Sequence, residues 1–286
     1  MSGVLEVSAD WLALREAEDA RARSRRLAHL AAGLAAGAAG DLPARTRALT
    51  VHDLGSGTGS MMRWLAPQLP GPQNWVLHDW NAGLTARAVG AAPPHDRAGR
   101  PIAVDARVTP LDGLTAADLA GADLVTASAL LDVVTAPEAH AVVDACVGVG
   151  APVFLPLSVT GDVEVRPWDP RDIRFARAFN EHQRREVDGR RLLGRFGAPI
   201  VRGLFARAGW HVRTALTTWR LDRRDPRLLG EWFDGWVDAA AEQAQVDRDR
   251  SLLDQAVAYR ELRGGQQRNG GLSAVVYHLD VLAWPR

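Results

Sequence analysis

Residues that could do chemistry are concentrated between Val51 and Ser60, where the sequence reads Val-His-Asp-Leu-Gly-Ser-Gly-Thr-Gly-Ser. A short apolar run ends in an acidic residue, and three glycines then alternate with small hydroxylated residues. Glycine lacks the Cβ atom that would hinder close approach or disfavour positive φ, so such a loop brings backbone amides close to a nucleotide-type ligand. The dinucleotide pattern G-x-G-x-x-G would require a third glycine where this chain has Ser60, so the spacing disfavours a dinucleotide.

A second acidic residue follows the loop at a distance typical of nucleotide binding. Residues 74–80, Asn-Trp-Val-Leu-His-Asp-Trp, are predicted to form a strand that ends at Asp79, 22 residues after Gly57. Nucleotide-binding α/β folds place a carboxylate at about this offset, where it accepts hydrogen bonds from ribose hydroxyls. The alternative is that Asp79 only stabilises a turn and that Trp80 belongs to the hydrophobic core.

Together these segments resemble the class I S-adenosylmethionine-dependent methyltransferases, whose first motif shares the D-x-G-x-G-x-G pattern of residues 53–59. The resemblance implies S-adenosylmethionine as cofactor, Asp79 as its ribose ligand and Trp80 as a wall of the adenine site. It further implies contacts to the adenine amino group from the turn at 112–113, although Asp112 could equally be a turn residue. The implied cofactor-binding residues are Asp53, Gly55, Ser56, Gly57, Gly59, Asp79, Trp80, Asp112, Gly113 and Ser128.

Methyl transfer from a sulfonium is an in-line displacement, for which the protein aligns a nucleophile, excludes water and sometimes removes a proton. Histidine is the natural proton acceptor near neutral pH. If residues 172–187 are helical, His182 shares a face with two phenylalanines. We therefore expect His182 beside an apolar pocket as a base, with Asn180 or Arg185 at the rim binding the methyl acceptor. The alternative is a partly buried histidine on a solvated basic helix.

Two further segments are candidates for binding the acceptor. On the predicted N-terminal helix, Trp11, Arg15, Asp19 and Arg23 recur at helical spacing and could line a lid, with Arg15 and Asp19 contacting the acceptor. The alternative is a surface helix that carries charge pairs four residues apart. On a later helix, Trp232 and another tryptophan one turn away face the same way. Trp232 is thus a candidate wall for a planar substrate, with core packing as the alternative.

The elements that position these residues form an α/β pattern. From 46 to about 160, strands alternate with helices, which indicates a parallel sheet covered on both faces. Two late strands follow an arginine-rich insertion at 162–198 and resemble the antiparallel pair that closes the class I methyltransferase sheet. We therefore predict a Rossmann-like, mostly parallel seven-stranded sheet, with a helical lid at 1–45 and a methyltransferase domain at 46–286 that carries the insertion on its substrate side.

Composition limits the possible partners and chemistry. The formal net charge is zero and the pI is about 7.1, so no strong electrostatic attraction to nucleic acid or an anionic membrane is expected. The single cysteine, Cys146, excludes an internal disulfide and a cysteine-cluster metal site, and no metal is expected. All 34 basic residues are arginine, which excludes lysine-based mechanisms. The N-terminus does not resemble a signal peptide and no apolar run approaches a membrane span, so we expect a cytoplasmic enzyme.

These patterns predict a methyltransferase that acts on a small molecule, at oxygen rather than nitrogen or carbon. The fourth strand is followed by Ser128-Ala129-Leu130-Leu131 instead of the Asn/Asp-Pro-Pro-Tyr/Phe signature, which argues against the amino-methylating nucleic-acid and glutamine enzymes. An RNA methyltransferase remains an alternative, but it should show a basic face. A non-catalytic binding protein with the same fold is the other alternative, because an intact glycine loop says nothing about turnover.

Overall fold

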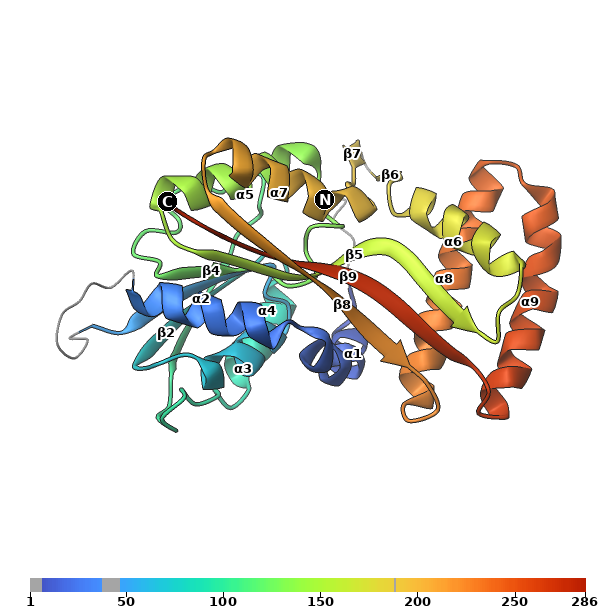
Figure 1. The fold of residues 1–286 in the computed structure, drawn as a ribbon, viewed down its shortest axis with the longest axis horizontal. Helices are drawn as coiled ribbons and strands as arrows, with labels where there is room; N and C mark the ends of the chain where they lie inside the picture. Colours follow the sequence, from blue (N-terminus) through green and yellow to red (C-terminus); the bar gives the residue numbers. More distant parts are fainter. Residues whose placement is uncertain (1–6, 38–46, 188) are drawn as a thin grey trace.

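The computed structural model describes residues 7–37, 47–187 and 189–286, and a seven-stranded sheet is its central element (Figure 1). Its strands are β1 (Leu49–Leu54), β2 (Gln73–Asp79), β3 (Ala103–Val108), β4 (Leu124–Thr126), β5 (Val153–Arg166), β8 (His211–Leu221) and β9 (Ser273–Trp284). They lie in the order β3-β2-β1-β4-β5-β9-β8. The first five strands are parallel, whereas β9 is antiparallel to β5 and β8. The predicted Rossmann-like sheet is confirmed.

Helices cover both faces of this sheet (Figure 1). The helices are α1 (Ala9–Ala22), α2 (Arg25–Gly37), α3 (Ser60–Leu65), α4 (Ala82–Gly90), α5 (Ala136–Val149), α6 (Arg171–His182), α7 (Gly197–Arg207), α8 (Pro226–Val246) and α9 (Arg250–Arg268). Helix α1 begins where the Ser8 hydroxyl accepts a hydrogen bond from the Trp11 amide at 3.1 Å. Helix α5 begins at a capping box between Thr135 and Glu138. Both starts follow from sequence patterns that satisfy otherwise unpaired amides.

The parallel strands divide their side chains between two hydrophobic cores. Leu49 and Val51 of β1 pack with α2 and α3, whereas Leu54 packs in the core that contains α5 and α7. In β4, Leu124 and Val125 are divided between the same two cores. Because successive side chains of a strand point to opposite faces, a strand covered on both sides is apolar at nearly every position. This explains the continuous apolar runs in the sequence.

Three strands reach far beyond this parallel core. Strands β5, β8 and β9 contain 14, 11 and 12 residues, against 6 in β1 and 3 in β4. They extend toward α6, α8 and α9 in the right half of Figure 1. A third hydrophobic core forms there, with Phe175 of α6, Trp219 of β8, Trp236 of α8 and Tyr259 of α9 among its members. The molecule is therefore elongated, with a parallel-sheet half and a second half built on the extended strands.

Some sequence expectations differ from the structure. Strand β5 continues to Arg166, so the first residues of the predicted insertion at 162–198 belong to the sheet. Helix α9 passes through Gly264 and Gly265, because helix packing outweighs the modest cost of glycine in a helix. Residues 1–6 and 38–45 of the predicted N-terminal segment lie outside the described residues. Within the described ranges, no helix combines the length and apolar character needed to cross a bilayer.

Candidate cofactor and acceptor site

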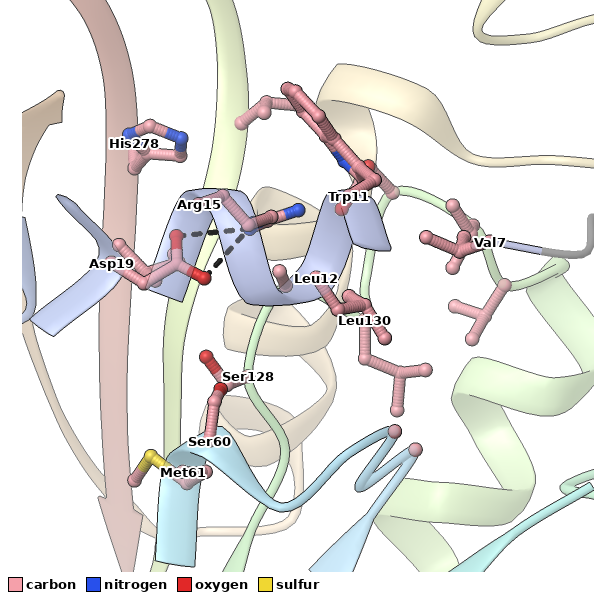
Figure 2. A pocket seen from close by; sticks show the side chains of 18 of the residues that line it. Val7, Trp11, Leu12, Arg15, Asp19, Ser60, Met61, Ser128, Leu130 and His278 are labelled. Carbon is pink, nitrogen blue, oxygen red and sulfur yellow. Dashed lines mark hydrogen bonds and ion pairs between the residues drawn. The ribbon is translucent and has the colours of Figure 1, made fainter. Parts of the chain in front are cut away.

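A cavity of about 650 Å³ lies at the carboxyl ends of the parallel strands, with one face of α1 among its walls (Figure 2). Ligands of open α/β sheets bind at this edge. Most of the predicted site residues contribute to the lining. Those that line the cavity are Asp53, Gly55, Ser56, Gly57, Asp79, Trp80, Asp112, Ser128, Arg15, Asp19 and Trp232, whereas Gly59, Gly113, Asn180, His182 and Arg185 do not.

The glycine loop between β1 and α3 contains three left-handed glycines, two of which are closely packed. Gly55 has φ +60° and Gly57 has φ +53°, values that favour glycine. A Cβ atom at Gly55 would lie 2.7 Å from Cδ1 of Leu130, and one at Gly57 would lie 3.2 Å from Cδ1 of Leu12 on α1. The loop is therefore packed closely between α1 and the segment after β4. Gly59 precedes α3 with φ +83° and shapes the start of that helix.

Asp79 is held at the end of β2 by two backbone amides. Its Oδ2 accepts a hydrogen bond from Gly57 N at 2.8 Å, and its Oδ1 accepts one from Asn81 N at 2.9 Å. Each carboxylate oxygen has a second lone pair, so the group can still accept hydrogen bonds from hydroxyls of a ligand. Trp80 is 36% exposed and lines the cavity together with Asp112. Gly113 lies beyond the lining, and a Cβ atom there would meet nothing within 4 Å.

Asp53 is a fully buried carboxyl group at the floor of the cavity. Its Oδ1 accepts a hydrogen bond from Thr126 Oγ1 at 2.7 Å, whereas its Oδ2 has no partner among the described residues. Burial disfavours the charged form and raises the pKa of Asp53 to about 7. An unpaired buried acceptor is costly unless a ligand satisfies it. The geometry therefore suits a bound ammonium or another donor at this place.

Arg23 also lines the cavity. From the sequence it was named only as one of four residues on a predicted helix face, with no role of its own. Its side chain is 2% exposed, and its Nη2 donates to Ser60 Oγ at 3.0 Å and to Ser128 Oγ at 3.1 Å. Its Nη1 has no partner, and the guanidinium forms no ion pair within the described part of the chain. Burial lowers the pKa of Arg23 from its usual value. A buried cation with an unused donor is suited to a carboxylate ligand.

Helix α1 presents a row of side chains to the cavity (Figure 2). Trp11, Leu12, Arg15 and Asp19 all line it, as their spacing along one face requires. Arg15 makes a two-pronged contact with Asp19, from Nε to Oδ2 at 2.9 Å and from Nη2 to Oδ1 at 3.1 Å. Asp19 also accepts a hydrogen bond from Trp219 Nε1 at 3.0 Å. Arg15 and Asp19, the predicted acceptor-binding pair, therefore neutralise each other's charge.

The predicted base and its companions lie elsewhere. His182 Nε2 lies 2.8 Å from Glu242 Oε2, in a separate polar depression that Arg185 also lines. Arg185 donates to the backbone oxygen of His182 at 2.9 Å. Asn180 donates to the backbone oxygen of Gly161 at 2.9 Å, where β5 is irregular. All three side chains have the protein's own groups as partners, and none lines the cavity.

A different histidine and a carboxylate are present in the cavity. His278 of β9 is 2% exposed, and its Nδ1 has no partner among the described residues. Burial lowers its pKa to about 3, so the imidazole is neutral. Asp132 lies after β4, its Oδ1 has no partner within the described part of the chain, and burial raises its pKa to about 6. Nothing in the local sequence distinguishes His278 from the other residues of its strand. The sequence alone therefore could not identify it as a cavity residue.

The strand order and the acid-terminated strands around a glycine loop define the fold of the class I methyltransferases. No family model and no curated protein matches the sequence. Similar solved structures include an O-methyltransferase family protein from Burkholderia thailandensis, which is 22% identical over 66% of this chain and 53% of its own, with a TM-score of 0.41. The matching part of this chain spans about half the length of that protein.

Two other similar structures cover more of the chain. The cyclopropane synthase MmaA2 from Mycobacterium tuberculosis is 13% identical over 90% of this chain and 82% of its own, with a TM-score of 0.42. An S-adenosylmethionine-dependent methyltransferase from Geobacter sulfurreducens, solved with S-adenosylhomocysteine, is 15% identical over 92% of each chain, with a TM-score of 0.38. At these identities and TM-scores, the similarity carries no information on the substrate.

Proposed function

We propose that the protein is an S-adenosylmethionine-dependent methyltransferase that acts on a small molecule. The observation that carries the proposal is the pair of unsatisfied buried charges in the cavity, Asp53 and Arg23. Free Oδ2 of Asp53 is an acceptor and free Nη1 of Arg23 is a donor. An α-amino acid head offers the matching ammonium and carboxylate, and the methionine portion of S-adenosylmethionine has such a head, whereas a nicotinamide dinucleotide does not.

The remaining lining residues fit the adenosine portion. Asp79 is fixed with spare lone pairs for the ribose hydroxyls, beside the amide of Gly57. Trp80 and Asp112 line the same end and suit the face and the amino group of adenine. The bound cofactor would supply an electrophilic methyl group on a good leaving group. The chain's own residues then have to position the acceptor and receive its proton.

The charge of the cavity favours a cationic ligand over an anionic one. Carboxyl groups outnumber guanidinium groups in the lining. The carboxyl groups are those of Asp19, Asp53, Asp79, Asp112, Asp132, Glu138 and Asp162, and the guanidinium groups are those of Arg15, Arg23 and Arg190. Opposite charges attract more strongly in a site that excludes water than in bulk solvent. A sulfonium is therefore stabilised here, and a cavity of about 650 Å³ leaves room for a small acceptor beside the cofactor.

Oxygen is the acceptor atom that we propose, with Asp132 in place of His182 as the proton acceptor. The Asp132 carboxyl has a pKa of about 6, so it is mostly ionised at neutral pH and has an unpaired oxygen. It follows β4 at the sheet edge where ligands bind. The bound cofactor would supply its methyl group to the acceptor oxygen and keep the electron pair of the carbon–sulfur bond on sulfur. Asp132 would receive the hydroxyl proton.

Calorimetric titration tests the proposal directly. We expect S-adenosylmethionine and S-adenosylhomocysteine to bind with micromolar dissociation constants, and NAD, as the control, not to bind. Failure of both methyl-donor ligands to bind would contradict the proposal. Binding without methyl transfer to any acceptor in a screen with labelled cofactor would instead favour a non-catalytic binding protein with this fold.

Proton release on cofactor binding is a further expected result. The pKa of Asp53 is about 7 in the free protein, and a bound ammonium favours its charged form and so lowers that pKa. Affinity should therefore fall as pH drops below 7, by up to about tenfold per pH unit. Calorimetry at pH 6 in buffers of different ionisation enthalpy should detect close to one released proton. Asp53→Asn should abolish the release, and an unchanged proton count in that variant would contradict the assignment.

The same carboxyl group links stability to pH in the free protein. Its folded-state pKa is raised from 3.8 to about 7, so its contribution is fully present below the unfolded pKa and is lost as pH rises through 7. Between pH 4 and pH 8 the loss amounts to about 2–4 kcal/mol. Relative to the parent, ligand-free Asp53→Asn should therefore gain stability as pH rises, which denaturant unfolding at both pH values would measure.

A further inference from the structure

The end of the cavity away from the glycine loop is formed by aromatic side chains, which we call the aromatic chamber. The chamber consists of Trp11 of α1, Phe179 of α6, Trp219 of β8, and Trp232 and Trp236 of α8. Its members come from α1 and from the second half of the molecule, outside the parallel core. Trp232 and Trp236 stack with ring centroids 5.7 Å apart and an interplanar angle of 16°. The chamber therefore offers flat apolar surfaces that suit a flat apolar ligand.

One buried polar atom of a chamber residue has no partner among the described residues. Nε1 of Trp236 is buried, the residue is 2% exposed, and no described residue accepts a hydrogen bond from that N–H group. Buried tryptophan N–H groups usually find an acceptor, because leaving one unpaired is unfavourable. By contrast, Trp219 of the same chamber donates to Asp19. A ligand with an oxygen acceptor would satisfy the Trp236 donor.

The charges around the chamber exclude an anionic group from this role. Arg15 lies over the Trp219 ring, 4.8 Å from its centroid, but it is occupied by the two-pronged contact with Asp19. Asp162 also lines the cavity and adds negative charge. Among the described lining residues, no cation near the chamber is left to compensate an anion. The ligand should therefore not be an anion.

We propose that the methyl acceptor is a neutral, planar aromatic molecule whose oxygen accepts a hydrogen bond from Trp236 Nε1 while its ring packs against the chamber tryptophans. This inference rests on the proposed function and names the substrate class for the same cavity. The stacked rings of Trp232 and Trp236 favour a planar ligand, and the unpaired N–H group of Trp236 favours a ligand with an oxygen acceptor. The surplus of carboxyl groups in the lining disfavours an anionic ligand.

The experiment uses the protein saturated with S-adenosylhomocysteine, titrated with three probes by calorimetry. The probes are 2-naphthol, its ring-saturated counterpart decahydro-2-naphthol, and 2-naphthoate. We expect 2-naphthol to bind at least about tenfold more tightly than the other two, because only it is planar and neutral with an oxygen acceptor. Tighter or equal binding of the saturated alcohol or of the carboxylate would overturn the proposal, as would no binding of any probe.

Two tryptophan variants locate the contact. Trp236→Phe keeps an aromatic ring but removes the N–H donor, and we expect it to weaken 2-naphthol binding about fivefold to tenfold. Trp210→Phe is the matched control, because Trp210 is buried in a different core and does not line the cavity. Equal 2-naphthol affinity in both variants would overturn the hydrogen bond to Trp236.

The S-adenosylhomocysteine titration separates the two levels of inference. If that ligand does not bind to the parent protein, the proposed function fails before any probe is tested. If it binds equally to the parent and to both variants, the variants are folded and the probe results report on the chamber alone. Trp232→Leu provides a second variant, for which the loss of the stacked face should weaken 2-naphthol more than decahydro-2-naphthol.

Discussion

Replacing Arg23 with methionine is expected to weaken S-adenosylmethionine binding at least about 100-fold, because the cofactor carboxylate would lose a charge-assisted partner in a buried site. The fold should tolerate the change. Arg23 forms no ion pair within the described residues; it donates hydrogen bonds to the hydroxyls of Ser60 and Ser128, and its guanidinium lies over the Trp64 ring, 5.4 Å from the centroid. Replacing a buried charge with an apolar side chain of similar length is often neutral or stabilising. The ligand-free variant should therefore unfold at the same denaturant concentration as the parent, or higher.

Isothermal titration of Arg23→Met and of a matched control would check this expectation. Arg21→Met is the control, because Arg21 lies in the last turn of α1, two residues before Arg23, its side chain is 61% exposed, and it pairs with Glu18 away from the cavity. Adenosine, which lacks the amino acid head, should bind equally to the parent and both variants. Parent-like affinity of Arg23→Met for S-adenosylmethionine would remove Arg23 from the cofactor site.

Asp79→Ala is expected to lower cofactor affinity between about tenfold and 100-fold. The substitution removes the proposed acceptor of two ribose hydroxyls and also the carboxylate to which the amides of Gly57 and Asn81 donate. Unlike Arg23→Met, it should weaken adenosine binding as well, because the lost contacts are to the nucleoside. Titration with adenosine therefore distinguishes the two halves of the cofactor site.

The control for Asp79→Ala is Asp105→Ala on the neighbouring strand β3. Asp105 is exposed, lies outside the cavity lining, and accepts a hydrogen bond only from the adjacent backbone amide of Ala106 among the described residues. Its substitution should leave both ligands unaffected. Unchanged adenosine affinity in Asp79→Ala would exclude the ribose assignment.

The geometry of the glycine-loop end of the cavity was predictable because short contiguous segments set it. The positive φ angles of Gly55 and Gly57 follow from residue type, and Asp79 reaches Gly57 because adjacent parallel strands end at the same edge. The sheet itself followed from alternating apolar strands and helices. Such patterns are local, so a single sequence displays them.

The rest of the site depends on contacts between distant segments. Arg23 meets Ser128 across 105 residues, and no local pattern indicates that the guanidinium turns inward. His182 shares a helix face with Phe175 and Phe179, as expected, and Phe179 does line the cavity. Helix α6 ends at His182, however, and the imidazole pairs with Glu242 of α8 instead. Spacing on a helix predicts which residues share a face. It does not predict which other part of the protein each of those residues contacts.

The extended strands described above determine how a protein of this design can acquire a new acceptor. Strands β5, β9 and β8 belong to both halves, so their backbone hydrogen bonds would be broken by any attempt to exchange the aromatic half as a module. Helices α6 and α8 also supply side chains to the chamber, but they lie outside the sheet. Substitutions on these helices would therefore leave the hydrogen bonds between the strands in place. Under the proposed function, acceptor specificity should change through point substitutions on these two helices, and libraries confined to their chamber-facing positions should leave the proposed cofactor site intact.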